Sequence, residues 1–253
     1  MIRAENIYKS FDDNEVLKGI TTEFYPGKTN LIIGRSGAGK TVLLKLLIGL
    51  HAPTSGKVFY DDVDFFSLSK KEVRSIRMKV GMLFQASALF DSMTVEENIR
   101  FPLDMFTNMT WKEKENRVNF CLERVNLGKV NDNYPSEISG GMQKRVGIAR
   151  AIVLEPKYLF CDEPNSGLDP KTSIVIDELI RDITVENNIT TVINTHDMNS
   201  VMEIGDNVIL LYKGEIAWRG NRDEVLQSDN ETLHDFMFAS PFLQQLRDSA
   251  LQK

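Results

Sequence analysis

Gly34-Arg35-Ser36-Gly37-Ala38-Gly39-Lys40-Thr41 is the segment from which a fold class can be read most directly. It matches a glycine, four residues and then Gly-Lys-Ser/Thr, the pattern of a loop that cradles phosphates. Glycines let the backbone pass close to a polyphosphate, so that successive N–H groups point at its oxygens. Lys40 would add a positive charge at the β- and γ-phosphates, and the Thr41 hydroxyl can bind Mg²⁺. We therefore predict a nucleotide site formed by Gly34, Arg35, Ser36, Gly37, Ala38, Gly39, Lys40, Thr41 and Val42.

The residues on either side of this loop support the prediction. Leu31–Ile33 is typical of a buried strand, and the apolar run Val42–Ile48 predicts a helix that ends at Gly49. Such a helix points the positive end of its dipole at the phosphates. A glycine-rich turn that matches by chance is the alternative, and the order strand, loop, helix argues against it.

Composition and charge limit the class of protein. The chain has 253 residues, of which 42% are hydrophobic and 26% charged, so we expect one large domain or a core with an inserted subdomain. No apolar run reaches the 18 residues of a membrane span, and the first residues lack the apolar core of a signal peptide, so we expect a cytosolic protein. Cys121 and Cys161 predict neither a disulfide framework nor a zinc site. The net charge of −6 argues against a nucleic-acid partner.

The first third of the chain alternates between strand and turn signals. Residues 2–8, 20–25 and 56–62 predict strands. Phe11 lies in a polar, loop-like stretch, where it could stack on a nucleobase or pack on the surface. Ser69-Lys70-Lys71-Glu72 predicts a capping box that opens a helix to about Lys79. Gln85 stands at the end of a predicted strand, Val80–Phe84, where α/β folds meet their ligands.

From Ala86 to about Val153 the signals are helical. Thr94 and Thr110 each begin a capping box. The segment closes with Ser139-Gly140-Gly141-Met142 and a helix that ends near Glu155-Pro156. The pattern predicts a helical insertion into the α/β core, with an apolar stripe made by Val118, Cys121, Leu122 and Val125.

The second half of the core places carboxylates at a strand end. Tyr158–Cys161 predicts a strand that delivers Asp162 and Glu163, of which the first can hold Mg²⁺ and the second can polarise an attacking water. Asp169-Pro170 predicts the start of a helix that runs to about Glu186. Later predicted features are a strand at residues 190–195 that ends at His196, a hairpin across Gly214, and an amphipathic tail marked by Leu233, Phe236, Met237, Phe242, Leu243 and Leu246.

These motifs, in this order and at these spacings, resemble an ABC-type ATPase over roughly residues 2–225. The resemblance implies an α/β P-loop NTPase fold, with an ABC-type RecA-like core, an N-terminal antiparallel β subdomain and an inserted helical subdomain. The corresponding domains are an ATP-binding core at residues 1–86 and 154–230, a helical subdomain at 87–153 and a C-terminal tail at 231–253.

The resemblance also implies the role of each motif. Gly34–Thr41 corresponds to the Walker A loop, Tyr158–Asp162 to the Walker B strand, Ser139–Met142 to the signature, and Ser166–Asp169 to the D-loop. The implied catalytic residues are Glu163, His196 (the switch histidine), Gln85 (of the Q-loop) and Lys40. Outside the Walker A loop, the implied ATP-binding residues are Phe11, Ser139, Gly140, Gly141 and Asp169, and the implied Mg²⁺ ligands are Thr41, Gln85 and Asp162. Three positions depart from the commonest pattern. The signature reads Ile-Ser-Gly-Gly-Met, where leucine is commonest first and glutamine last, and Asn165 stands where threonine is frequent.

A transport role follows from the same resemblance. In the family, the signature faces a nucleotide held by another cassette, which implies a homodimer enclosing two ATP molecules and a separate membrane permease. The stretch 88–103 and the segment 162–170 are similar to the ATPase of the maintenance-of-lipid-asymmetry (Mla) phospholipid transporters of Gram-negative envelopes. We therefore expect a peripheral protein on the cytoplasmic face of the inner membrane, with Phe90 and Met93 at the permease contact and with accessory subunits left open.

Other functions remain as alternatives. An amino-acid or metal importer of the same family is the nearest. A non-transport ABC ATPase acting on DNA or ribosomes is less favoured, because such proteins usually carry two cassettes or a long coiled coil. A nucleotide sensor without catalysis is disfavoured because Glu163 and His196 are both present.

Overall fold

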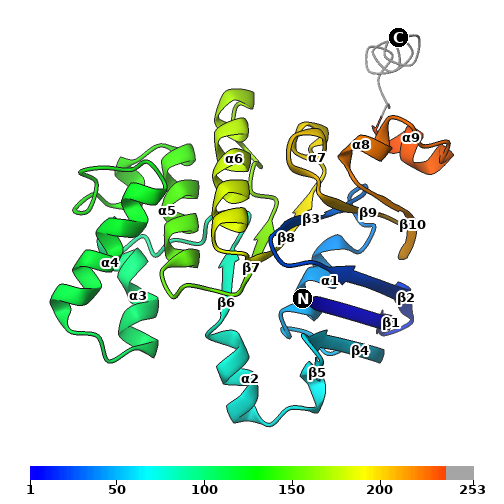
Figure 1. Ribbon diagram of the computed structural model, residues 1–253, viewed down its shortest axis with the longest axis horizontal. Helices are drawn as coiled ribbons and strands as arrows, with labels where there is room; N and C mark the ends of the chain where they lie inside the picture. Colours follow the sequence, from blue (N-terminus) through cyan, green and yellow to red (C-terminus); the bar gives the residue numbers. More distant parts are fainter. Residues whose placement is uncertain (238–253) are drawn as a thin grey trace. The chain divides into compact units, whose positions relative to one another are not determined.

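The computed structural model describes residues 1–237, which form two compact units (Figure 1). The first unit contains Met1–Tyr25, Thr29–Phe66 and, among the described residues, the chain from Asn194 to Met237. The second contains Pro26–Lys28 and Ser67–Ile193. The predicted helical subdomain, residues 87–153, lies inside the second unit, but that unit is larger, so the predicted domain boundaries stay a prediction.

An antiparallel sheet in the first unit has the strand order β2-β1-β4-β5. Its strands are β1 (Ile2–Phe11), β2 (Asn14–Phe24), β4 (Ser55–Tyr60) and β5 (Val63–Asp64). Phe11 ends β1 and pairs with Asn14, so the prediction that it lies in a loop is wrong. Backbone pairing between adjacent strands extends the hairpin to its turn even though the local sequence is polar.

A second group of elements in the first unit includes the strand before the Walker A loop and the helix after it. β3 (Lys28–Ile33) pairs in parallel with β9 (Asn207–Tyr212), and β9 pairs antiparallel with β10 (Glu215–Gly220), which confirms the predicted hairpin. Leu31, Ile32 and Ile33 are all buried. The helices are α1 (Lys40–Leu47), α7 (Met198–Ile204), α8 (Arg222–Val225) and α9 (Glu231–Met237).

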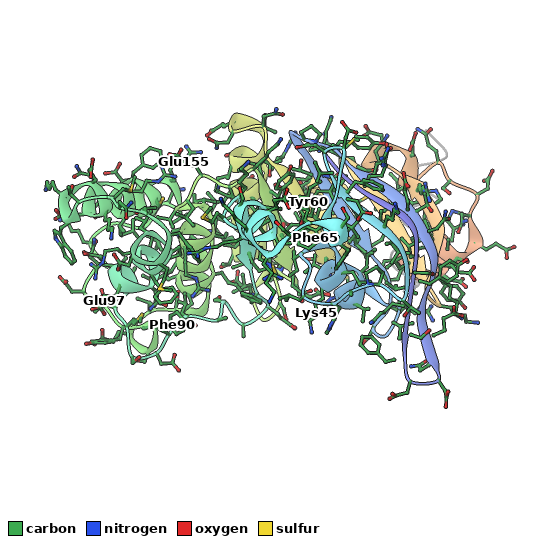
Figure 2. All side chains as sticks on the ribbon, turned by 90° about the horizontal axis from the view of Figure 1, so that it is seen from below. Lys45, Tyr60, Phe65, Phe90, Glu97 and Glu155 are labelled. Atoms are coloured by element: carbon green, nitrogen blue, oxygen red, sulfur yellow. The ribbon has the colours of Figure 1, made fainter. Side chains whose placement is uncertain are left out.

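The end of α1 shows why a glycine is needed there. Gly49 has φ +71°, and a Cβ at this position would lie 2.2 Å from Cε1 of Phe65. Phe65 begins a short 3₁₀ helix, η1 (Phe65–Ser67), and its ring lies 5.4 Å from that of Tyr60 (Figure 2). The Tyr60 hydroxyl donates to the Leu47 carbonyl at 2.7 Å, which satisfies one of the unpaired carbonyls at the helix end. The predicted helix end at Gly49 is therefore confirmed to within two residues.

The second unit combines parallel strands with helices. Its strands are β6 (Val80–Leu83), β7 (Tyr158–Asp162) and β8 (Thr190–Thr195), with β7 between the other two. Its helices are α2 (Lys70–Arg77), α3 (Val95–Phe106), α4 (Trp111–Arg124), α5 (Gly140–Ile152), α6 (Pro170–Glu186) and the 3₁₀ helix η2 (Pro135–Glu137). Among these, α3, α4 and α5 pack on one another (green in Figure 1).

Local helix-start signals are confirmed. Ser69, Thr94 and Thr110 each form a capping box with the glutamate three residues later. Asp169 is the N-cap of α6, with Pro170 at its first position. In each case a side-chain oxygen accepts a hydrogen bond from an amide that the helix leaves unpaired.

Within residues 1–237, no helix is long and apolar enough to cross a membrane. In the predicted amphipathic tail, Leu233 and Met237 are buried on α9, and Phe236 on the same helix is half-buried. The remaining tail positions, Phe242, Leu243 and Leu246, lie outside the described residues.

Candidate nucleotide and signature sites

The Walker A loop uses its three glycines for different reasons. A Cβ on Gly34 (φ +146°) would lie 2.4 Å from the Leu211 carbonyl oxygen, and one on Gly39 (φ +105°) would lie 2.8 Å from Cδ2 of Leu17. Gly37 (φ +81°) has no atom within 4 Å of its Cβ position. All three φ values favour glycine. Gly34 and Gly39 therefore fit against their own unit, whereas Gly37 leaves an open face that a phosphate could approach.

Lys40 and Thr41 begin α1. The Lys40 ammonium is nearly buried and donates to the Gly34 carbonyl at 2.7 Å and to the Arg35 carbonyl at 3.4 Å, so it is held inside the loop. Thr41 is exposed. Gly39 provides no side-chain cap, and the first turn of α1 contains no acidic residue. This helix terminus therefore fits an anion.

Two further predicted residues belong to the first unit. Phe11 is 40% exposed, with the Lys9 ammonium 4.8 Å from its ring centroid and the His51 ring edge-on at 5.6 Å. His196 is exposed and follows directly after the buried Thr195 of β8. The Asp197 amide donates to the Thr195 hydroxyl at 3.0 Å, and Asp197 caps α7, which fixes the backbone on both sides of the histidine.

In the second unit, the parallel strands β6 and β7 bring Gln85 and the carboxylates to one edge. Leu83 and Cys161 are paired across these strands. Because parallel strands end at the same edge of a sheet, Gln85, Asp162 and Glu163 follow from neighbouring strand ends. The Gln85 side-chain amide donates to the Ser166 hydroxyl at 3.2 Å, so the Q-loop contacts the segment before the D-loop aspartate. Glu163 has φ +49°, a left-handed conformation that is rare for a residue other than glycine.

The signature opens α5. Ser139 is its N-cap and accepts from the Met142 amide at 3.3 Å. A Cβ on Gly141 would lie 2.7 Å from Cγ2 of Thr172 in α6, whereas a Cβ on Gly140 would have nothing within 4 Å. Gly141 therefore permits close packing of the two helices, and Gly140 is the glycine with an open face suited to a ligand.

Asp169 has a structural role at the start of α6. Its carboxylate accepts from the Thr172 amide at 3.0 Å and from the Thr172 hydroxyl at 2.5 Å. The hydrogen bond from the Thr172 side chain is the main reason that the pKa of Asp169 lies below its usual value. Its predicted role in nucleotide binding stays a prediction.

The sequence analysis missed two cations on α5. Lys144 is buried and donates to the carbonyls of Gln85 and Glu163, and Arg150 donates to the carbonyls of Ser87 and Ala88. Burial lowers the pKa of Lys144, and the nearby carboxylates of Glu163 and Asp162 oppose that shift. The available signal was the presence of three basic residues, Lys144, Arg145 and Arg150, in a segment whose other residues are mostly apolar or glycine.

The predicted Mg²⁺ ligands are all oxygen donors. The first unit offers the Thr41 hydroxyl, and the second offers the Gln85 amide oxygen and the Asp162 carboxylate. Such hard donors suit Mg²⁺, which usually binds through one or two carboxylates, substrate phosphates and water. No cluster of three or more His, Cys, Asp or Glu side chains suited to a metal occurs in the described part of the chain.

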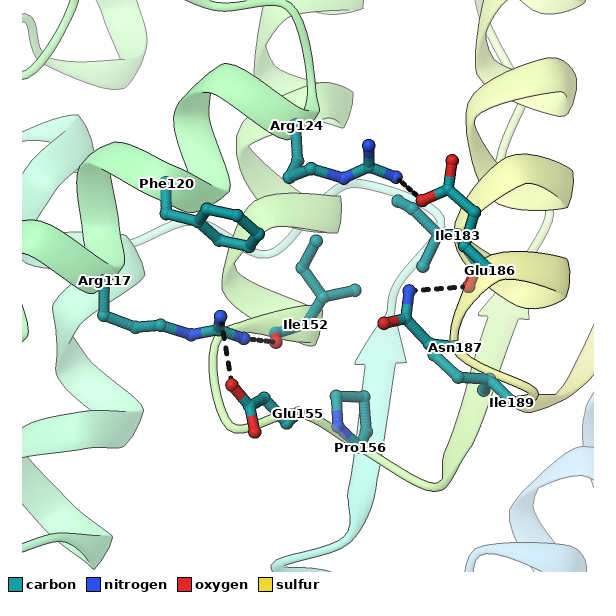
Figure 3. Close-up of a pocket in the computed structure, with 10 residues that line it drawn as sticks. All are labelled: Arg117, Phe120, Arg124, Ile152, Glu155, Pro156, Ile183, Glu186, Asn187 and Ile189. Carbon is teal, nitrogen blue, oxygen red and sulfur yellow. Dashed lines mark hydrogen bonds and ion pairs between the residues drawn. The ribbon is translucent and has the colours of Figure 1, made fainter.

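A pocket of about 420 Å³ lies in the second unit between α4, the end of α5 and α6 (Figure 3). Arg117 on its wall donates to the carbonyls of Ile152 and Val153 and pairs with Glu155 at 3.2 Å, and Arg124 pairs with Glu186. None of the predicted site residues lines it. This pocket is therefore separate from the residues predicted to bind nucleotide.

The comparison with protein families gives one match. The family model described as "ABC transporter" matches residues 17–166. This range contains the Walker A loop, Gln85, the signature, Asp162 and Glu163.

Curated relatives match nearly the whole chain. The "Probable ribonucleotide transport ATP-binding protein mkl" of Mycobacterium leprae is 38% identical over 236 residues, which cover 93% of this chain and 68% of the relative. The "Methionine import ATP-binding protein MetN" of Corynebacterium diphtheriae is 40% identical over 228 residues, which cover 88% of this chain and 67% of the relative. The chain thus spans about two thirds of the length of these relatives.

Solved structures of ABC proteins are similar to this chain in fold and sequence. The ATP-binding cassette MJ0796, in a dimeric post-hydrolysis state bound to ADP and Pi, has a TM-score of 0.80 and 31% identity, over 88% of this chain and 99% of that one. The cbiO1 protein of Clostridium perfringens, described as part of the ABC transporter complex cbiONQ, has a TM-score of 0.84 and 30% identity, over 98% of both chains. The predicted P-loop NTPase fold of an ABC cassette is confirmed.

Proposed function

Because the chain belongs to the ABC transporter family, we propose that its ATPase activity drives a membrane permease that moves phospholipids between the inner membrane and the outer envelope. The general function follows from the family: the chain is an ATPase subunit that binds ATP with Mg²⁺, dimerises and works with a permease. The phospholipid substrate is the proposal. It is supported by one observation, the similarity of the segments 88–103 and 162–170 to the Mla ATPase. The proposed location is the cytoplasmic face of the inner membrane.

We propose roles in hydrolysis for predicted site residues of the first unit and of the second unit. Glu163 would accept a proton from the attacking water, and the Lys40 ammonium would lie against the β- and γ-phosphates. His196 would lie near the γ-phosphate, and Phe11 would stack on the base. Mg²⁺, held by Thr41, Gln85 and Asp162, would supply charge to offset that of the phosphate oxygens.

The signature would complete a nucleotide site on a second copy of the chain. Ser139 and Gly140 present an exposed helix terminus, and the first turn of α5 contains no acidic residue. An anion is favoured at such a terminus. In the proposed homodimer, this terminus faces the γ-phosphate bound by the partner's Walker A loop, so each ATP lies between two chains.

The proposed permease contact is the loop before α3. The Phe90 side chain is 42% exposed and lies at the edge of the helical part (Figure 2). Its ring is 5.0 Å from that of Phe101, while Met93 is only half-buried. Phe90 follows Gln85 closely in the sequence, so a permease bound to this exposed ring would be connected to the nucleotide site.

The named relatives favour a second candidate, an importer of a small polar solute. The name of MetN refers to methionine import, and the name of mkl refers to ribonucleotide transport. The ATPase core would be the same in either case, because the permease and its accessory subunits select the substrate.

One experiment separates these candidates. The chain is co-expressed with the permease that co-purifies with it from membranes, and the complex is reconstituted into proteoliposomes. ATP-dependent transfer of a fluorescent phospholipid to acceptor vesicles is expected, with no ATP-dependent uptake of radiolabelled methionine. Methionine uptake without lipid transfer would contradict the phospholipid proposal and leave the ATPase assignment intact.

A further inference from the structure

Two cations on α5 hold the backbone of the segment that follows β6. The Arg150 guanidinium donates to the Ser87 carbonyl at 2.7 Å and to the Ala88 carbonyl at 2.8 Å. The Lys144 ammonium donates to the Gln85 carbonyl. Three of four consecutive carbonyls, at positions 85, 87 and 88, are therefore bound by side chains of the helix that the signature opens.

The helix also packs closely on this segment. A Cβ on Gly147, between the two cations in sequence, would lie 2.8 Å from Cδ1 of Leu83 and 3.5 Å from Cβ of Ser87. Ser87 and Ala88 have φ values of +59° and +48°, which are unfavourable for residues with a Cβ. Such a conformation persists only where surrounding contacts impose it, and the Arg150 hydrogen bonds are such contacts.

Lys144 makes a second connection that Arg150 does not. Its ammonium also donates to the Glu163 carbonyl, at 3.4 Å. Glu163 is itself in the left-handed region, with φ +49°. Lys144 is 4% exposed, and an ammonium has three donors, so one buried group joins the backbones that follow β6 and β7.

We propose that Lys144 is a positioning residue for ATP hydrolysis, because its ammonium ties the backbones of Gln85 and Glu163 to the signature helix α5. Arg150 links the backbones of Ser87 and Ala88 to the same helix through its hydrogen bonds. The orientations of the Gln85 amide and the Glu163 carboxylate then depend on a side chain whose ammonium is bound to backbone carbonyls. The inference rests on the roles proposed above for Gln85 and Glu163.

An apolar residue could not replace Lys144, because it would offer no donor to the Gln85 and Glu163 carbonyls. Removal of the ammonium leaves two part-buried carbonyls without their charged donor, and they reorient toward water or other donors. The side chains on the same backbone turn with them. Misplacement of reacting groups by about 1 Å can lower a rate about 100-fold while leaving binding of the substrate almost unchanged.

The test compares Lys144→Met with Arg145→Met in the full-length chain. Arg145 is the next residue on α5 and donates to a different carbonyl, that of Asn126 at 3.2 Å, so the control removes the same charge from the same helix. We expect Lys144→Met to lower kcat about 10- to 100-fold with KM for ATP within about threefold of wild type. Lys144→Arg, which keeps a cation with several donors, should recover most of kcat. Arg145→Met should stay within about twofold.

Amide hydrogen exchange gives a second readout that does not depend on catalysis. Lys144→Met should raise the exchange rates of peptides covering residues 84–90 and 163–166, and Arg145→Met should not. Lys144→Gln takes the place of Lys144→Met if that variant does not fold. The inference is overturned if kcat stays within twofold of wild type, if Arg145→Met loses as much activity, or if Lys144→Arg recovers none. A Glu163→Gln variant with wild-type turnover would instead refute the role proposed for Glu163, which is a different result.

Discussion

The side chain of Asn98 pairs with both backbone groups of Phe90. Its oxygen accepts from the Phe90 amide at 2.8 Å and its nitrogen donates to the Phe90 carbonyl at 3.1 Å. The same nitrogen also donates to the carbonyls of Met93 and Thr94. Asn98 is fully buried on α3, so one side chain fixes the loop that presents Phe90.

Asn98→Ala should therefore loosen this loop. The variant removes the side-chain hydrogen bonds to part-buried backbone groups, among them the Phe90 amide and the Met93 carbonyl, which costs about 1–3 kcal/mol of the free energy of unfolding. Urea denaturation measures the change, and Asn108→Ala, at an exposed asparagine after α3, should shift it by less than about 0.5 kcal/mol. Equal effects of the two substitutions would mean that Asn98 does not anchor the loop.

Phe90→Asp should release the permease without unfolding the cassette. Burial of one such side chain at an interface contributes roughly 1.5–3 kcal/mol, and a carboxylate there would add a desolvation cost. The measurement is co-purification of the permease from detergent, with circular dichroism and ATP binding as folding controls. Phe120→Asp, at a ring that is 49% exposed on α4, should have no effect on co-purification. If the double variant Phe90→Asp, Met93→Asp still binds the permease fully, the contact lies elsewhere.

Glu163→Gln should keep ATP binding and lose most of the hydrolysis. Loss of a general base costs about 10²–10⁴ in rate, and the slow variant should accumulate as an ATP-bound dimer. Phosphate release and size-exclusion chromatography measure these two effects. The matched control is Glu155→Gln, because Glu155 is another glutamate of the second unit with positive φ, at +53°. Wild-type turnover by Glu163→Gln would exclude its role as the base.

Mixed dimers test whether each site is shared between chains. A Lys40→Ala chain and a Ser139→Arg chain should each be inactive alone. A dimer of one of each has one site without either substitution, formed by Lys40 of one chain and Ser139 of the other. We expect partial recovery of ATPase activity on mixing. No recovery, with mixed dimers shown by differential tagging, would contradict the shared site.

Both thiols should be unreactive in the folded protein at pH 8. Cys121 and Cys161 are fully buried, and burial raises the pKa of Cys121 from 9.0 to about 11 and that of Cys161 further. Only the thiolate attacks an aromatic disulfide reagent, so colour should develop only as the chain unfolds. Because the folded pKa is raised, the stabilising contribution of Cys121 is complete below pH 9.0 and is lost as the pH rises toward 11. A thiol that reacts within seconds at pH 8 without denaturant would contradict this burial.

Much of the fold could be predicted because the signals are local. The capping boxes at Ser69, Thr94 and Thr110, and the Asp169-Pro170 start of α6, depend on residues within one helical turn. The predicted strand 190–195 is confirmed at both ends, since a buried run needs no distant partner to be recognised. The Walker A pattern likewise indicated the nucleotide loop from eight consecutive residues.

Long-range contacts account for what the sequence could not provide. Phe11 belongs to a strand because Asn14 pairs with it, and no feature of its polar neighbours requires that. Gly34, Gly37 and Gly39 look alike in the sequence, yet Leu211 and Leu17 crowd two of them and leave the third open. Lys144 could be recognised only once parallel pairing of β6 with β7 had brought the Gln85 and Glu163 carbonyls to one ammonium. Local chemistry thus determines where helices and strands begin, whereas the partners of a buried charge are set by chain segments about 60 and 20 residues away in sequence, which only tertiary packing brings together.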